Sequence, residues 1–168
     1  EAKNRYYAFD ICPGFWDWMD YVVEDGKVMS IAPVRDELLA GKDELADWVE
    51  ARKNEEWFNA VSDTKTQKNF SEIAAWVQAS PYREPAKAKF LSGADPWLIA
   101  KAMTIGAKIV THEVAEPNAR RRIPLPNVCD QFSVGWANTF DLLRKLEASF
   151  SFRATSTQGT AGLERHPT

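Results

Sequence analysis

Hydrophobic residues recur at helical spacing along most of this chain, and short β-branched runs stand between the helical segments. The clearest example lies between residues 93 and 113. Its apolar spacing predicts a helix over 96–105, and Gly106 follows where a left-handed residue ends many helices. The next residues, 107–111, form a short β-branched run bounded by turn signals, which predicts a strand.

The same reasoning predicts the other elements. Helices are expected from Phe15 to Gly26, from Pro33 to Leu39, from Asp43 through Phe58, over 70–77, and from a Thr139 cap to Leu146; strands are expected over 27–31 and 134–137. Between them, residues 81–92 have a basic character from Arg83, Lys87 and Lys89, which are weaker candidates for phosphate contact than the arginine run over 120–122. Strands separated by helices are typical of a parallel sheet, so the pattern predicts one α/β domain.

Chain geometry then places two acidic residues together. A helix over 96–105 advances about 15 Å, and a strand over 107–111 returns about 16 Å. Asp95 and Glu113 should therefore lie at one edge of the fold, at the carboxyl end of the strand, where open α/β sheets hold their ligands. Two carboxylates at such an edge indicate a metal site. Each residue also has a simpler interpretation: Asp95 as the cap of a helix that Pro96 opens, and Glu113 as a solvated loop residue.

Composition adds few restrictions. The chain is 45% hydrophobic and 27% charged, with a net charge of −3, which argues against a protein that coats nucleic acid by bulk charge but allows a local basic patch. Cys12 and Cys129 form no CxxC pair, and a reducing cytoplasm is the simplest setting for them. No apolar run reaches the ~20 residues that span a membrane. Residues 151–168 are small, polar and aperiodic, and we expect a poorly ordered tail.

Several stretches together resemble a known family. The segments NRYYAFDICPGFWDW, VRDELL, GADPWLIAKA, IVTHE and NTFDLLRKL are similar to a group of prokaryotic PIN-like proteins, related to the PIN-domain ribonucleases that act as toxins in toxin–antitoxin pairs. The resemblance covers residues 1–150. It implies a three-layer α/β fold with a short parallel sheet flanked by helices. It also implies RNA as substrate and an antitoxin, a DNA-binding regulator or a second copy of the chain as protein partners.

The resemblance also implies a set of metal ligands. Glu37, Asp95 and Glu113 match three acidic positions of the PIN pattern, and Mg²⁺ or Mn²⁺ would be the ion, since both prefer hard oxygen ligands. Asp36 and Asp141 are outside candidates. The family's first acid, on an opening strand, has no match here; we expect that strand upstream of Glu1, and Asp10 does not replace it.

Other polar and aromatic residues keep two interpretations. Arg120, Arg121 and Arg122 form either a solvated face or a contact with RNA phosphates. His112 is either a structural loop residue or a member of the site, and the aromatic stripe over 15–21 is either core and partner surface or an RNA-stacking platform. The main alternative for the whole chain is a non-catalytic PIN-like module that binds an antitoxin or regulator.

Overall fold

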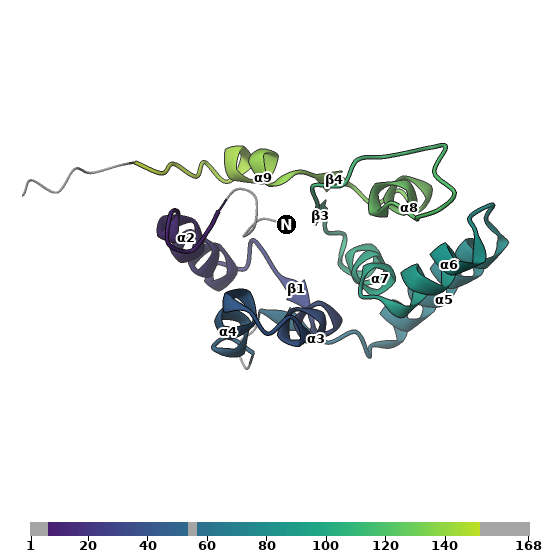
Figure 1. The fold of residues 1–168 in the computed structure, drawn as a ribbon, viewed down its shortest axis with the longest axis horizontal. Helices are drawn as coiled ribbons and strands as arrows, with labels where there is room; N and C mark the ends of the chain where they lie inside the picture. The colour runs from purple at the N-terminus through teal and green to yellow at the C-terminus, as the bar shows by residue number, and fades with distance from the viewer. Residues whose placement is uncertain (1–6, 54–56, 152–168) are drawn as a thin grey trace, which may run out of the picture.

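The computed structural model describes residues 7–53 and 57–151. This part of the chain forms eight helices and four very short strands, a mixed α/β fold (Figure 1). In chain order they are α2 (Pro13–Glu24), β1 (Ser30–Ile31), α3 (Ala32–Ala40), α4 (Glu44–Glu50), β2 (Phe58–Asn59), α5 (Thr64–Ala79), α6 (Glu84–Ser92), α7 (Asp95–Ile105), β3 (Ile109–Val110), α8 (Leu125–Gln131), β4 (Trp136–Ala137) and α9 (Thr139–Lys145).

The strands form two separate parallel pairs. Strand β1 pairs with β2, and β3 pairs with β4. The second pair continues beyond its formal ends, because the Ile109 amide donates to the Gly135 carbonyl at 2.9 Å and the Thr111 amide donates to the Ala137 carbonyl at 2.9 Å. Parallel pairing was predicted from the alternation of strands and helices, and it is confirmed at this level.

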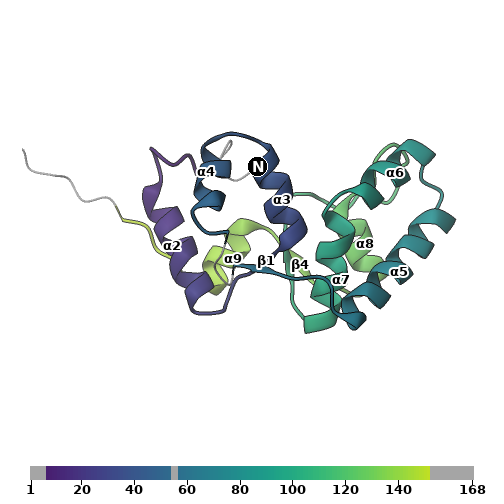
Figure 2. The ribbon, with the colours of Figure 1, turned by 90° about the horizontal axis from the view of Figure 1, so that it is seen from below.

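The helices gather into two groups, which both views show (Figures 1 and 2). Helices α5, α6, α7 and α8 share a large apolar core that includes Ile73, Ile99 and Val128, none of which has exposed surface. Helices α2, α4 and α9 surround a smaller aromatic cluster around Phe15 and Trp16. The aromatic stripe over 15–21 thus contributes largely to a core.

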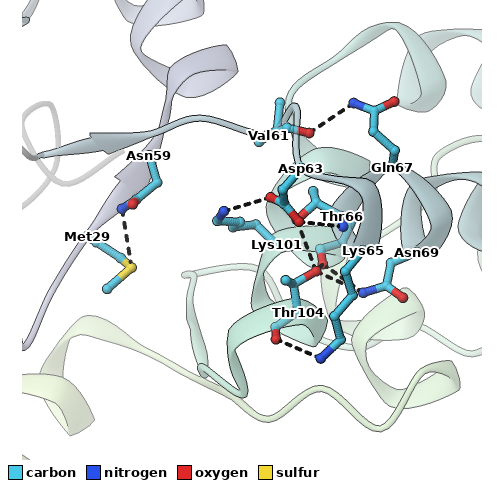
Figure 3. A network of polar contacts seen from close by, with 11 residues as sticks. Met29, Asn59, Val61, Asp63, Lys65, Thr66, Gln67, Asn69, Lys101 and Thr104 are labelled. Atoms are coloured by element: carbon cyan, nitrogen blue, oxygen red, sulfur yellow. Dashed lines mark hydrogen bonds and ion pairs between the residues drawn. The ribbon is translucent and has the colours of Figure 1, made fainter.

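Helix α7 belongs to the first group and also packs on α3 and β1. It packs most extensively on α5 and also touches α6, α8 and β3. Its end is fixed by Gly106, whose φ of 70° is the left-handed conformation that the sequence predicted there. Toward that end a polar network joins it to α5 (Figure 3): Thr66 Oγ1 donates to Thr104 Oγ1 at 3.0 Å, and Lys101 Nζ donates to Asp63 Oδ2 at 3.0 Å.

The helix predicted from Asp43 through Phe58 is too long at its C-terminal end, and residues 54–56 of that stretch lie outside the described part of the chain. Asp43 does cap it, since its Oδ1 accepts from the amides of Leu45 and Ala46, but α4 ends at Glu50. Further on, Trp57 is buried against the Trp48 ring, with centroids 4.9 Å apart, and the Trp57 carbonyl accepts from the Ser30 amide. Aromatic residues suit a half-buried strand, and this pairing with β1 makes Phe58 a strand residue.

Two helices were missed and two caps were misplaced. Helices α6 and α8 each begin with a proline in the first two positions, a start signal that the prediction passed over. Asp95 does not cap α7: Ala94 is the N-cap and makes no side-chain cap bond, so the capping interpretation of Asp95 is wrong. Helix α9 is capped by Asn138, whose Oδ1 accepts from the Asp141 amide at 2.9 Å, and not by Thr139.

Some expectations lie outside the described residues. The expected tail over 151–168 falls there from residue 152 onward, and so do residues 1–6. Within the described part of the chain, no helix is long and apolar enough to cross a membrane.

Candidate functional site

One cavity of about 690 Å³ collects most of the charged residues that the sequence singled out. It opens where the end of α6, the start of α7, α3 and the loop before α8 meet. Its charged lining consists of the acids Glu37, Asp95 and Glu113 and the cations Lys89, Arg121 and Arg122, and the rest is Pro85, Ala86, Phe90, Ser92, Gly93, Ala94 and Ile123. A second cavity of about 520 Å³, beside β1 and β2, has Glu24 as its one ionisable lining residue and offers no comparable chemistry.

Glu37 enters the cavity from α3 and is held at the start of α7. Its Oε1 accepts from the Ala94 amide at 2.7 Å, which satisfies a backbone donor at that helix start. Glu37 Oε1 also lies close to Gly93, where an added Cβ would stand 3.4 Å from this oxygen, in van der Waals contact. Glu37 is thus both a cavity acid and a tie between α3 and α7.

Asp95 is the first residue of α7 and lines the cavity, where part of its surface is exposed to solvent. Its pKa is raised to about 6, first because the surrounding protein displaces water and then because Glu113 and Glu37 are also negative. A helix N-terminus alone would favour the charged carboxylate. The opposite shift shows that Asp95 carries negative charge that its protein surroundings do not compensate.

Glu113 follows β3 and is tied to α8. Its amide donates to Thr111 Oγ1 at 3.1 Å, which turns the chain after the strand, and its Oε2 accepts from the Leu125 amide at 2.8 Å. Asp95 and Glu113 line the same cavity, Asp95 from the start of α7 and Glu113 from the loop after β3. The sequence argument had placed both at one edge.

The donor set suits a hard divalent cation, but it is not a closed cage. Three carboxylates face one solvent-accessible space, and one oxygen of each glutamate already accepts a backbone amide. Within residues 7–53 and 57–151, no three His, Cys, Asp or Glu side chains stand close enough to ligate one ion together. Because Mg²⁺ keeps several waters and uses only one or two protein carboxylates directly, it does not require all three acids as direct ligands, and one or two of them could hold it.

The arginine run divides into different roles. Arg120 does not line the cavity; its Nη1 donates to the Ala119 carbonyl at 2.7 Å and to the Pro117 carbonyl at 3.3 Å, which braces the loop. Arg122 lines the cavity and pairs with Glu116, and this hydrogen bond is the main reason that its pKa is raised. Arg121 lines the cavity and is exposed.

The remaining sequence candidates lie elsewhere. His112 Nε2 is 2.9 Å from Thr139 Oγ1, so His112 links the end of β3 to α9 and does not line the cavity. Asp36 pairs with Arg35 at 2.8 Å, and Asp141 pairs with Arg144 at 3.1 Å. None of these three joins the acids.

Sequence reasoning ranked Lys89 too low. It was one of several lysines and arginines in a basic stretch, with nothing to distinguish it from Lys87. Recognition of α6 would have provided the signal, since residues two apart on a helix point in different directions. Lys87 turns inward and Lys89 lines the cavity.

Comparison with known proteins gives a family. A family model described as a domain of unknown function (DUF4411) matches residues 1–150. No curated protein and no solved structure matches the chain. The matched range contains every residue that lines the cavity.

Proposed function

The chain belongs to the DUF4411 family of domains of unknown function, and from its charged cavity we propose that it is a divalent-metal-dependent ribonuclease with a PIN-like three-layer fold. In this proposal it is the toxin of a toxin–antitoxin pair and works in the cytoplasm. RNA is its substrate, and an antitoxin or DNA-binding regulator is its protein partner. The observation that carries the proposal is one cavity with three acids beside three cations.

The acids supply what such an ion requires. Glu37, Asp95 and Glu113 would hold Mg²⁺ or Mn²⁺, and the bound ion would activate a water and stabilise charge on the leaving oxygen of a phosphodiester. Asp95 supports this assignment, because its pKa near 6 means that the site favours a neutralising partner. At neutral pH that partner is a cation rather than a proton.

The cations supply what a polyanionic substrate requires. Arg121 and Arg122 lie in the same cavity as the acids, so a phosphate could contact them while the scissile bond faces the carboxylates. Arginine is well suited to this contact because its fork of donors matches phosphate oxygens. We assign Arg120 to the support of its own loop. The nucleic-acid contact expected from residues 120–122 is therefore reduced to Arg121 and Arg122.

A second function, a non-catalytic binding module, is favoured by one observation. Glu37 and Glu113 each satisfy a backbone amide at a helix start, which is a sufficient structural reason for both residues. In that case the cavity would be a polar surface for an antitoxin or regulator, and the acids would bind no ion.

Cleavage of RNA by the full chain separates the two. The ribonuclease proposal expects cleavage of labelled RNA with Mg²⁺ or Mn²⁺, its loss with a chelator, and its return when the ion is added back in excess. It also expects either ion to raise the melting temperature, since a ligand that binds only the folded state stabilises it. If saturating metal produces no cleavage and no shift of the melting temperature, the binding module is the function that remains.

A further inference from the structure

We propose that Lys89 is a substrate-positioning residue, and that with Arg121 it forms a phosphate-binding rim for single-stranded nucleic acid at the mouth of the acid cavity. This inference deepens the proposed function and rests on it for the identity of the reaction. It names a residue and a substrate form that the family description does not give.

Helix α6 separates its two lysines by environment. Lys87 is buried, and its Nζ donates to the Gln78 carbonyl at 2.8 Å and to Glu84 Oε1 at 2.9 Å, so its charge supports the end of α5. Lys89 is exposed and lines the cavity. The same short segment therefore provides one structural lysine and one that faces the site.

The backbone at Lys89 is connected by hydrogen bonds and a short segment of chain to the part of the cavity that holds Glu37. Its carbonyl accepts from Ser92 Oγ at 3.0 Å, and the next turn brings Gly93 and then Ala94, whose amide holds Glu37. The position of Lys89 is thus fixed relative to the acids by one short stretch of chain. Its long side chain remains in solvent, as a group that meets an incoming polyanion should.

The charges of the rim are available for a ligand. Among the described residues, Arg122 is the cavity cation with an ion pair, to Glu116, whereas Lys89 and Arg121 make none within 4.0 Å. Lys89 and Arg121 line the same cavity as the three carboxylates but form no ion pair with them, so both cations can bind an anionic ligand. Phosphate groups carry that charge at regular spacing along a strand.

The size of the cavity is suited to one unstacked nucleotide. About 690 Å³ is the volume of a small-molecule site. A nucleotide enters such a space only when it leaves its stack, which costs least in a strand that is already single. We therefore infer that an unstacked nucleotide occupies the cavity while neighbouring phosphates contact Lys89 and Arg121.

The test is binding without metal, so that it does not depend on cleavage. Affinity of the full chain for a labelled single-stranded RNA is measured by fluorescence anisotropy in chelator over a series of salt concentrations. Lys89→Ala should weaken binding several-fold and reduce the slope of log K against log salt by about 0.7, the value for one phosphate contact on a single strand. Lys89→Arg should restore both.

Lys68→Ala is the matched control, because Lys68 is an exposed lysine on α5 that does not line the cavity. It should leave the slope unchanged. Thermal melts of all three variants should match wild type, since both lysines are exposed. Single-stranded DNA should show the same loss of slope, because the contact is to phosphate.

Several results would overturn the inference. They are an unchanged slope in Lys89→Ala, an equal drop in Lys68→Ala, duplex RNA binding as tightly as single-stranded RNA, or no binding of wild type to either single strand. The failures remain distinguishable: binding with the predicted slope but no metal-dependent cleavage would refute the ribonuclease and keep the rim. Metal-dependent cleavage together with an unchanged slope in Lys89→Ala would keep the ribonuclease proposal and refute the rim.

Discussion

Helix α7 joins two polar clusters in which the same kind of side chain behaves in opposite ways. At its start, Asp95 faces two other acids, and its pKa is raised to about 6. Further along the helix, Lys101 meets Asp63, whose pKa is lowered to about 2 (Figure 3). Both carboxylates have exposed surface, but the protein displaces much more water around Asp95 than around Asp63, and this is the first cause of the raised pKa of Asp95.

The hydrogen-bond donors and charges around each carboxylate are a second cause of the difference between the two pKa values. Asp63 accepts from the Thr66 amide at 2.9 Å and from Lys101 Nζ at 3.0 Å, and both favour its charged form. Asp95 has displaced water and the charges of Glu113 and Glu37 in their place. A carboxylate supplied with donors holds the fold together, whereas one left among like charges is a candidate for chemistry.

The largest expected effect comes from removing the uncompensated charge. Asp95→Asn should lower metal-dependent RNA cleavage by more than about 100-fold, because even residues that only support metal ligands cost 10- to 100-fold when changed. The variant should still fold, since Asp95 makes no cap bond. Initial rates at saturating metal measure the loss, and Asp63→Asn is the control that should keep near-normal cleavage. Equal rates for wild type and Asp95→Asn would exclude a ligand role.

A smaller effect is expected from breaking the polar network between α5 and α7 that contains Asp63, Thr66 and Thr104. Thr66→Val keeps the shape of a fully buried side chain but removes the hydroxyl that donates to Thr104 Oγ1. The free energy of unfolding should fall by about 1 kcal/mol, the net value of one such hydrogen bond, with cleavage largely retained. Denaturant unfolding measures this change in the free energy of unfolding. Ser71→Ala removes an exposed hydroxyl from the same helix and should change nothing measurable.

A third way to test the comparison is the pH dependence of stability. The pKa of Asp95 in the folded state lies above its ordinary value of 3.8, so the folded state binds the extra proton and the destabilising charge develops as pH rises from 3.8 through about 6. Without metal, Asp95→Asn should therefore be more stable than wild type at neutral pH, by a margin that shrinks toward pH 4.

Asp63 has the opposite sign. Its folded pKa is depressed, so its stabilisation is present above pH 3.8 and is lost as pH falls toward about 2. Asp63→Asn should be less stable than wild type at neutral pH, and the deficit should narrow only in strong acid. Thermal melts of both variants over the pH range measure the two trends, and parallel trends would contradict the comparison.

Local signals in the sequence predicted much of α7 and of the parallel pairing. Gly106 ends α7 as expected, and the β-branched residues around Ile109 form a strand, although its formal extent is shorter than 107–111. These features depend on neighbouring residues, which sequence patterns report directly. Caps were harder to predict, because Asp95 carries a capping side chain but the chain enters the helix one residue earlier, at Ala94.

Tertiary contacts explain the remaining errors. Phe58 continues a helical pattern in sequence, but β1 and Trp48 provide a better place for this aromatic segment. In the site, chain geometry placed Asp95 and Glu113 at one edge, whereas the position of Glu37 came only from a family resemblance. Lys89 could not be separated from Lys87 without the orientation of α6.

The Glu37–Ala94 hydrogen bond has a consequence for the order in which the molecule assembles. It spans 57 residues of chain, whereas the Glu113–Leu125 bond spans 12. Closing the longer loop costs about 1.4 kcal/mol more in chain entropy, and this cost is recovered only when α3 and α7 are already in place. The three acids therefore meet only in the fully assembled chain, so a partly folded or nascent protein lacks the complete site.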